Sequence, residues 1–269
     1  MSNSKNIHPT AIIADGATIA DDVTVGAYSV IGAKVTIGKG TRVASHVVID
    51  GRTTIGEGNN IFQFASIGAA PQDLKYKGED TLLEIGDKNI IREYATLQPG
   101  TAGGHGFTKV GNNNLFMVYS HIGHDGIVGN NNVFANSCAL AGHVTVGNNV
   151  IVGGLCGIHQ FVKVGDFSML GGGSMVGKDV PPYCITHGDH AGLVGINQIG
   201  LERHGFSPEQ IQLIRRLFRE IFMGSKTMSQ RLALAQEKYG DEPLANAFIQ
   251  FILNSERGVM SLRRRGGEG

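Results

Sequence analysis

The chain has 269 residues, and its 23 Lys+Arg balance 23 Asp+Glu, so no overall charge favours nucleic acid or an anionic membrane surface. Glycine is abundant at 40 residues, tryptophan is absent and aromatic residues make up 7%, which favours a thin, repetitive core over a large globular one. No apolar signal segment and no run of 18 apolar residues occur, so we expect a cytoplasmic protein without membrane insertion.

An aliphatic or aromatic residue recurs every six positions from Ile7 to Ile67, resumes at Ile85 and again at Val110, and continues to Val176. This period is neither that of a helix nor that of an isolated strand. It is typical of a solenoid with three flat faces, in which one coil takes about eighteen residues. Gly, Asn and Asp follow the aliphatic positions; they tolerate positive φ and bond their own backbone, so they mark the corners. The repeat predicts a mainly β fold, a left-handed parallel β-helix over residues 1–185.

Two interruptions break the repeat and are predicted to be loops that leave the solenoid. Residues 68–84 carry Asp73 and Glu79 where the period requires inward aliphatic side chains. Residues 98–109, with the sequence QPGTAGGHGFTK, shift the phase by one position.

The faces can be counted if neither loop forms coils of its own. Ile67 and Leu97 then lie on the same face as Ile122, and both loops leave from the corner edge that carries His124. Two unrelated interruptions at one polar edge favour a functional site there.

The repeat ends near the pair Pro181-Pro182, and residues 186–269 are predicted to form a linker and a C-terminal helical domain that caps the prism. The segment Leu262–Gly269 is predicted to be a frayed tail. Three helices are expected, beginning at a capping box Ser207–Gln210, at a Thr227–Gln230 cap and at Pro243, the last ending near Leu253.

Residues eighteen apart stack along the solenoid axis, about 4.8 Å from coil to coil. Two adjacent columns result: one holds His124, Gly142 and Gln160, and the other holds Asp125, His143 and Phe161. A neutral imidazole at His124 can accept a hydroxyl proton, Asp125 can fix its tautomer across the corner bend, and backbone N–H groups near Gly142 can donate to an oxyanion. Two coils span about 9–10 Å, enough for one sugar ring. The edge therefore predicts acyl transfer to a hydroxyl.

Simpler interpretations compete with this one. His124 and Asp125 could belong to a solvated turn. A zinc site of the γ-carbonic-anhydrase kind needs three histidines, but His121 and His124 are three apart at different repeat offsets without a His-x4-His pair, so no metal is predicted. Cys138 and Cys156, eighteen apart, are expected to be buried spacers rather than a redox pair. The cluster of Arg215, Arg216 and Arg219 could dock an acidic partner or form a solvated helix face.

The motifs IHPTAII, PQDLKY, HIGHD, LAGHV, IHQF, DVPPY and GINQIGLERHGFS resemble those of the bacterial UDP-N-acetylglucosamine O-acyltransferases. The resemblance runs from Ile7 to the last helix, and HIGHD together with GLERHGFS is its most specific part. It implies the first step of lipid A synthesis: transfer of a 3-hydroxyacyl chain from acyl carrier protein to the sugar 3-hydroxyl. It also implies a homotrimer, with no metal or small cofactor.

Carried over by motif, the resemblance implies that His124 is the general base, Asp125 its orienting partner and Gly142 the oxyanion donor. Gly172, inside a Gly-Gly-Gly run, is implied to set acyl-chain length. The implied substrate contacts are Asp73, Leu74, Lys75, His121, His143, His159, Gln160, Asn197, Arg203 and His204. The chain departs from the family pattern at Ile199, where a Glu is frequent, and at His204, where an Arg is frequent, so nucleotide contacts there are expected to differ.

Other protein classes remain as alternatives. N-acyltransferases of the same pathway carry a uridine-binding domain before the repeats, for which a repeat beginning at Ile7 leaves no room. Acetyl-CoA-dependent sugar acetyltransferases usually lack the GLERHGF segment, and an inert scaffold does not account for the aligned histidine edge. The sequence leaves open the acyl-chain length and whether the acceptor is a 3-hydroxyl or a 3-amine.

Overall fold

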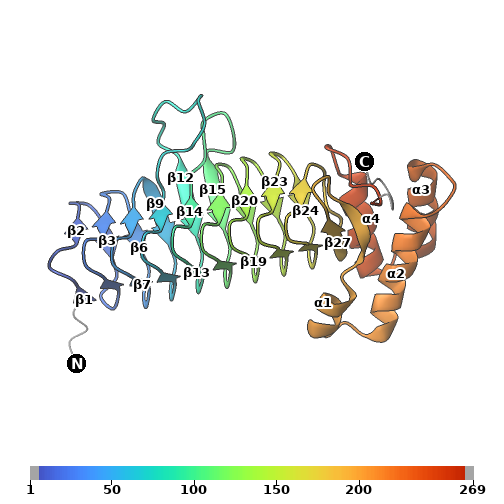
Figure 1. The fold of residues 1–269 in the computed structure, drawn as a ribbon, viewed down its shortest axis with the longest axis horizontal. Helices are drawn as coiled ribbons and strands as arrows, with labels where there is room; N and C mark the ends of the chain where they lie inside the picture. Colours follow the sequence, from blue (N-terminus) through green and yellow to red (C-terminus); the bar gives the residue numbers. More distant parts are fainter. Residues whose placement is uncertain (1–5, 264–269) are drawn as a thin grey trace.

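The computed structural model describes residues 6–263 as a three-sided prism of parallel strands followed by a small helical region (Figure 1). Three sheets, here named A, B and C, form the sides, and successive strands pass from A to B to C. The predicted left-handed parallel β-helix is confirmed.

The strand bounds follow sheet by sheet. Sheet A contains β1 Asn6–Ile7, β4 Thr24–Val25, β7 Arg42–Val43, β10 Asn60–Ile61, β13 Ile90–Ile91, β16 Leu115–Phe116, β19 Val133–Phe134, β22 Ile151–Val152, β25 Met169–Leu170, β27 Cys184–His187 and β28 Gly192–Ile196. Sheet B contains β2 Ile12–Ile13, β5 Val30–Ile31, β8 Val48–Ile49, β11 Ser66–Ile67, β14 Thr96–Leu97, β17 His121–Ile122, β20 Ala139–Leu140, β23 Gly157–Ile158 and β26 Met175–Val176. Sheet C contains β3 Thr18–Ile19, β6 Thr36–Ile37, β9 Arg52–Ile55, β12 Leu82–Ile85, β15 Phe107–Val110, β18 Ile127–Val128, β21 Thr145–Val146 and β24 Lys163–Val164.

The six-residue period arises because each two-residue strand buries its second residue and turns its first outward. Ile31 is fully buried inside the prism, whereas Val30 beside it is exposed on the face of sheet B. Phe116 and Phe134 stack inside the prism at 4.9 Å between ring centroids. The core is therefore a narrow column of aliphatic and aromatic side chains, as the low aromatic content and high glycine content predicted.

The corners combine positive φ with side-chain hydrogen bonds that run between coils. Asn113, Asn131 and Asn149 have positive φ, as expected for corner residues. We predicted that corner side chains bond their own backbone, and for the neighbouring asparagines this is wrong. The side chain of Asn130 instead accepts from the N–H of Asn112, one coil earlier. These bonds form between coils because stacking in register places the corner of the neighbouring coil within reach of each amide side chain.

Both interruptions leave from the corner between sheets B and C and project together (Figure 1). β11, β14 and β17 are neighbours in sheet B, so Ile67, Leu97 and Ile122 share a face as predicted. The loops end earlier than expected, because β12 begins at Leu82 and β15 at Phe107. These two strands are four residues long and pair with each other along their full length, which the six-residue rule alone does not predict.

The C-terminal end contains elements that the sequence did not reveal. Sheet A continues past the proline pair, because β27 pairs with β25 and folds back on β28 as an antiparallel hairpin. Leu262, expected in a frayed tail, forms a bridge with Leu193, and residues 264–269 of that tail lie outside the described residues. Within residues 6–263 the helices are α1 Gln198–Arg203, which was not predicted, α2 Pro208–Phe222, α3 Met228–Tyr239 and α4 Pro243–Leu253.

The three predicted helix starts are present. Ser207 and Gln210 form a reciprocal capping box at the start of α2, and Thr227 and Gln230 do the same for α3. In the described part of the chain, no helix is long and apolar enough to cross a membrane. Cys138 and Cys156 are free and buried as expected, and burial raises the pKa of the Cys138 thiol to about 12.

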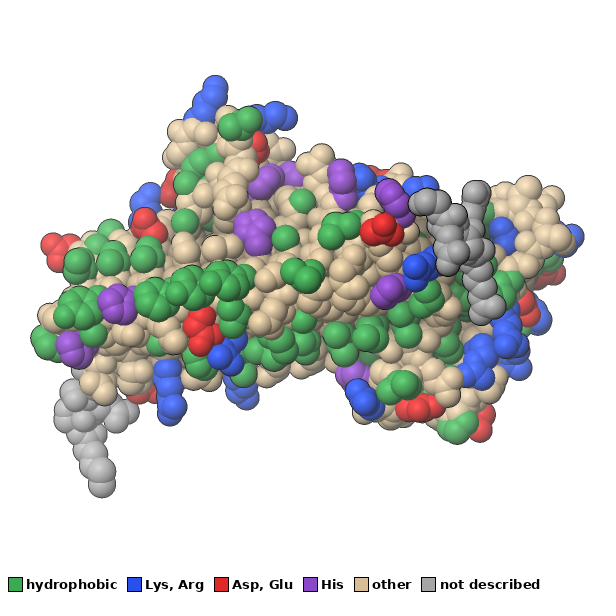
Figure 2. All heavy atoms as spheres, viewed as in Figure 1, with side chains coloured by type: hydrophobic (Ala, Val, Ile, Leu, Met, Phe, Trp, Pro, Cys, Tyr) green, Lys and Arg blue, Asp and Glu red, His purple; other side chains and the backbone are tan. Residues whose placement is uncertain are grey.

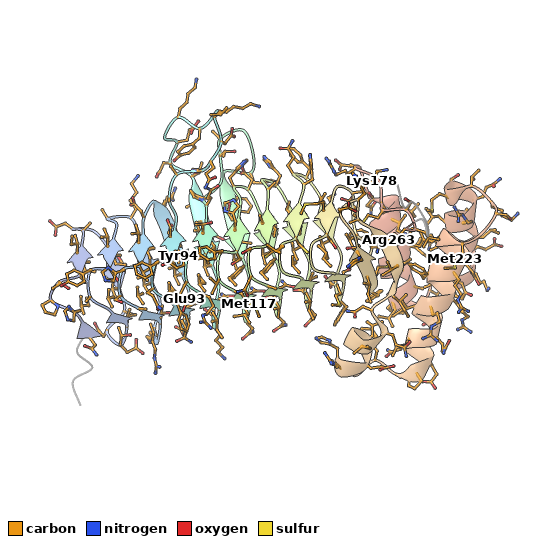
Figure 3. The ribbon with its side chains drawn as sticks, viewed as in Figure 1. Glu93, Tyr94, Met117, Lys178, Met223 and Arg263 are labelled. Carbon is orange, nitrogen blue, oxygen red and sulfur yellow. The ribbon has the colours of Figure 1, made fainter. Side chains whose placement is uncertain are left out.

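An exposed aromatic ladder follows the corner between sheets A and B in the N-terminal half. Its rings stack at 4.8 to 5.4 Å between centroids, in the order Tyr28, His46, Phe64, Tyr94 and Tyr119. Figure 2 shows a row of apolar side chains along this half of the prism, and Figure 3 places Tyr94 and Glu93 on its surface, level with the base of the projecting loops. The neighbouring face of sheet B adds the exposed side chains of Ile12, Val30 and Val48.

Candidate active site

The two stacked columns predicted at the B–C corner are present, and His124 and Asp125 form a close pair within them. The Nδ1 atom of His124 lies 2.8 Å from Oδ2 of Asp125. Adjacent residues of a flat strand would point to opposite faces; here Asp125 has φ +57°, which bends the corner and turns both side chains to the same place. The His124 side chain is 17% exposed, whereas the carboxylate of Asp125 is fully buried.

Five donor contacts hold the buried carboxylate of Asp125. The backbone N–H of Thr101 lies 3.1 Å from both oxygens, and its hydroxyl donates to Oδ2 at 2.7 Å. The N–H of His105 donates to Oδ1 at 2.8 Å. Burial acts to raise the pKa of Asp125, but the hydrogen bonds from His124 and Thr101 outweigh it and hold this pKa below its usual value. The carboxylate is therefore ionised and can only accept hydrogen bonds, which places the Nδ1 proton on His124 and leaves its Nε2 lone pair free.

Gly142 lies directly against the imidazole of His124, one coil further along the prism. A Cβ on Gly142 would come within 2.4 Å of Cε1 and 2.5 Å of Nε2 of His124. Within residues 6–263 the backbone N–H of Gly142 has no hydrogen-bond acceptor. A free N–H is common at these corners, so the distinctive feature is that this glycine lies against the His124 ring. Glycine is required here because any side chain would displace the ring.

The neighbouring histidines differ in what surrounds them. Nδ1 of His121 lies 2.7 Å from the hydroxyl of Thr96, and burial, with a smaller contribution from nearby His124, lowers the pKa of His121. The ring of His143 stacks on Phe161 at 4.4 Å between centroids and lies edge-on to His124. Burial also lowers the pKa of His143, although nearby Asp125 acts in the opposite direction. Both changes favour the neutral imidazole.

The first projecting loop brings two of its three predicted residues to this site. Asp73 and Lys75 line a cavity of about 190 Å³ together with His143 and Phe161. Leu74 between them is fully exposed and does not line that cavity.

A broader apolar groove crosses sheet B next to the histidine edge. It has a volume of about 770 Å³, and its lining includes His121, His159 and Met175. Small residues at the outward positions of two adjacent strands, Ala139 and Gly157, form its floor. The groove also contains His190, which our sequence reading missed because it assigned the β27–β28 turn to a linker. The sequence signal for the groove was the small size of the outward residues Ala139 and Gly157, between the larger His121 and Met175.

Gln160 and Gly172 lie at opposite edges of this face. Gln160 is exposed beside His159 at the B–C corner, in register with His124 and Gly142 as predicted. Gly172 lies at the A–B corner just before β26, and it does not line the groove described above. A Cβ there would meet only the backbone of Gly154, with its carbonyl oxygen at 3.4 Å.

The predicted nucleotide contacts in and around α1 are not brought together with His124 within one chain. α1 lies on the opposite side of the prism from the projecting loops (Figure 1). The amide of Asn197 caps this helix by accepting from the N–H of Gly200 and also donates to the carbonyl of Phe167. Ile199 is exposed, and Nδ1 of His204 lies 2.8 Å from the carbonyl oxygen of Gly200.

The described residues contain one possible metal-ligand set, formed by His105, Asp125 and His143, whose ligand atoms lie within 4.8 Å of one another. Each carboxylate oxygen of Asp125 already accepts at least two hydrogen bonds from Thr101, His105 and His124. A cation would have to displace these donors, so the arrangement does not favour metal binding.

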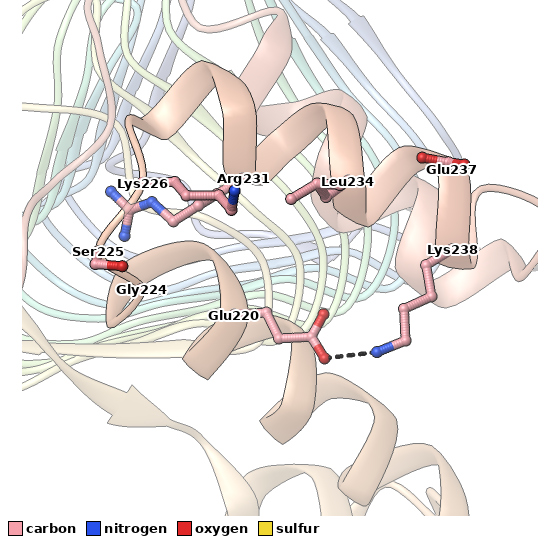
Figure 4. Close-up of a pocket in the computed structure, with 8 residues that line it drawn as sticks. All are labelled: Glu220, Gly224, Ser225, Lys226, Arg231, Leu234, Glu237 and Lys238. Atoms are coloured by element: carbon pink, nitrogen blue, oxygen red, sulfur yellow. Dashed lines mark hydrogen bonds and ion pairs between the residues drawn. The ribbon is translucent and has the colours of Figure 1, made fainter.

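A second large cavity, of about 700 Å³, lies between α2 and α3 and is separate from the histidine edge (Figure 4). Its lining includes Leu234 and the ion pair between Glu220 and Lys238, at 2.9 Å. None of its lining residues is a histidine, and the carboxylate of Glu220 is paired with Lys238, so this cavity has no counterpart of the His124–Asp125 pair.

Comparison with known proteins gives matches over nearly the whole chain. Residues 16–51 match the bacterial transferase hexapeptide family, and residues 179–260 match domain 2 of UDP-N-acetylglucosamine O-acyltransferase. The acyl-[acyl-carrier-protein]–UDP-N-acetylglucosamine O-acyltransferase of Sulfurovum sp. strain NBC37-1 is 50% identical over 96% of this chain and 98% of its own. The enzyme of the same name from Myxococcus xanthus is 50% identical over 94% and 98%. The chain belongs to this O-acyltransferase family.

A solved structure gives the same result for the fold. The UDP-N-acetylglucosamine O-acyltransferase of Moraxella catarrhalis superposes with a TM-score of 0.93 at 45% identity, covering 95% of this chain and 99% of that one. Membership of the O-acyltransferase family separates the protein from the inert scaffold and from the γ-carbonic-anhydrase-like enzymes considered above.

Proposed function

We propose that the protein transfers a 3-hydroxyacyl chain from acyl carrier protein to the 3-hydroxyl of UDP-N-acetylglucosamine, the first step of lipid A synthesis, in the cytoplasm. The observation that carries the proposal is the His124–Asp125 pair at 2.8 Å with Gly142 against the imidazole. The names of the relatives support the substrates.

In the proposed mechanism, Nε2 of His124 removes the proton of the sugar hydroxyl as its oxygen attacks the thioester carbonyl carbon. The C=O electron pair moves to the oxygen, and the N–H of Gly142 donates to the resulting oxyanion. When the intermediate collapses, the C–S bond breaks and the sulfur leaves with the proton held by His124. Asp125 stabilises the imidazolium between these two steps.

The sugar and its loop contacts are proposed to lie where the small cavity joins the histidine edge. Asp73 and Lys75 can reach a ligand beside His143 there, and Gln160, two coils from His124, is proposed to limit the far side of the sugar. Leu74 can contribute through its exposed side chain only if a substrate or another subunit covers it.

The acyl chain is proposed to follow the apolar groove on sheet B, starting between His121 and His159. The groove floor at Ala139 and Gly157 is apolar and uncharged, as a hydrocarbon chain requires. Gly172 lies at the far edge of the same face and is proposed to limit the chain length, because a larger side chain there would fill space that the end of the chain occupies.

The functional unit is proposed to be a homotrimer. Asn197, Arg203 and His204, the nucleotide contacts implied by the motifs, lie across the prism from His124, so one substrate can meet both sets only if they come from different subunits. The exposed aromatic ladder and the apolar face of sheet B also offer surface that a second copy would cover.

The test is mass spectrometry of the product made by purified protein from hydroxyacyl carrier-protein thioesters and UDP-N-acetylglucosamine. The expected product gains one hydroxyacyl group, and its ester is cleaved by mild alkali. An alkali-stable amide formed only with a 3-amino sugar would overturn the assigned acceptor. No turnover with either sugar would overturn the proposed function.

A further inference from the structure

The second projecting loop contains a feature for which the repeat and the motifs give no role. Its segment 101–105, Thr-Ala-Gly-Gly-His, wraps around the buried carboxylate of Asp125. Two backbone N–H groups and one hydroxyl from this segment donate to the two oxygens. A Cβ on Gly104 would lie 2.3 to 2.5 Å from all three carboxyl atoms, so this approach is possible only for glycine.

Within this wrap the hydroxyl of Thr101 has a particular position. It donates at 2.7 Å to Oδ2, the same oxygen that accepts from Nδ1 of His124 at 2.8 Å. An ionised carboxylate only accepts, so the hydroxyl must be the donor. Thr101 is itself buried, which makes this charge-assisted hydrogen bond stronger than one in water.

We propose that Thr101 is a positioning residue of the acyl transfer, which acts through Asp125 by fixing the carboxylate and by sharing the negative charge of Oδ2 with His124. The proposal rests on the assignment of His124 as the base. The hydroxyl withdraws charge from Oδ2 and so weakens the preference of this oxygen for a protonated imidazole. It also holds the carboxylate in one orientation, so that Nδ1 of His124 has a fixed acceptor.

Other titratable groups surround the pair and are the same in every variant considered. Nε2 of His143 lies 3.9 Å from Oδ2 of Asp125, and His121 lies in strand β17, just before the corner that carries His124. His105 belongs to the same loop, and Asp73 approaches His143 from the first loop. None of them is altered when the Thr101 hydroxyl is removed.

The experiment is the pH dependence of kcat/KM for the full-length enzyme carrying Thr101→Val, which keeps the shape and removes the donor. With more negative charge left on Oδ2, the protonated imidazole is favoured, so the acid limb of the profile is expected to move to higher pH by about half a unit to one unit. Thr101→Ser restores a hydroxyl and is expected to restore the wild-type profile. A loop that was merely loosened would lower the rate or raise KM at every pH without moving the limb.

Thr108 offers a matched control in strand β15, at the end of the same loop. Its hydroxyl is also buried but has no hydrogen-bond partner among residues 6–263, so Thr108→Val is expected to leave the acid limb where it is. If Thr101→Val does not fold, Gly104→Ala serves instead, because its methyl group must push the carboxylate away from its donors and is expected to alter the same limb.

The possible results separate the two proposals. If the wild-type protein turns over its substrates but the folded Thr101→Val variant keeps the wild-type acid limb, Thr101 has no positioning role and the proposed reaction still stands. If Thr108→Val moves the limb as far as Thr101→Val does, the effect is not specific to Oδ2, and the proposal is again overturned. If His124→Ala is fully active, it is the base assignment that fails.

Discussion

Replacing Gly142 by alanine tests whether the position of the His124 ring matters for turnover. Gly142 is outside the positive-φ region, so alanine meets no backbone strain there. Its Cβ would lie 2.4 Å from Cε1 of His124, whereas ordinary contacts begin at 3.4 Å, so the ring must move by about 1 Å. A misplacement of about 1 Å in a catalytic group can cost about 10²-fold in rate. We therefore expect kcat to fall by about two orders of magnitude while the solenoid stays folded.

The assay is steady-state turnover of the purified variant, with circular dichroism to check the fold. In a His124→Ala background, Gly142→Ala is expected to have little further effect, since the ring it displaces is gone. If Gly142→Ala keeps more than half of the wild-type kcat, or if the two substitutions act additively, the proposed role of the ring position is wrong.

Four further outcomes are expected. His124→Ala should lower kcat by about 10²–10⁴-fold without unfolding the protein, and near-normal turnover would rule out the general base. Light scattering should give three times the 28.5 kDa of one chain, and a stable, active monomer would contradict the trimer. Gly172→Met should shift donor preference from about 14 towards about 10 carbons, because four unburied methylenes cost about 3 kcal/mol, or about two decades in rate ratio. An unchanged preference in competition assays would exclude Gly172 as the ruler. Burial lowers the pKa of His121, so its contribution to stability is present above the unfolded pKa of about 6.5 and is lost as pH falls below it. The Tm of the wild type should thus fall more steeply than that of His121→Gln between about pH 7 and pH 5.

Most of the prism could be predicted because one arithmetic rule governs it. A period of six residues and a coil of eighteen place His124, Gly142 and Gln160 in one column, and the strand register of sheet B agrees. The rule also placed both loops on that edge, since β11, β14 and β17 are neighbours. Stacking in register is a backbone property, so it could be read without any knowledge of side-chain contacts.

The elements that were missed are those for which the repeat gives no information. After the prolines, the Cys-Ile-Thr-His stretch of β27 pairs with β25 and so extends sheet A, and β28 then folds back on β27. The hairpin was missed because the six-residue rule does not apply to antiparallel strands. The hydrogen bond from Thr101 to Asp125 could not be predicted either, because a loop with a phase shift has no defined register with the coil that it covers. Its contact with Asp125 depends on the path of the loop in space.

The residues proposed to carry the chemistry lie where the repeat is interrupted. A regular coil presents flat faces, and at its corners the asparagine side chains form hydrogen bonds with the neighbouring coil. Such a surface has no means of burying a carboxylate. The loop 98–106 changes this at one corner, because it covers Asp125 and supplies N–H and hydroxyl donors that keep the buried charge stable. The solenoid fixes the spacing of His124 and Gly142, and the loop makes a buried anion possible beside them. A change that shortens the loop should therefore impair the His124–Asp125 pair more than it impairs the fold.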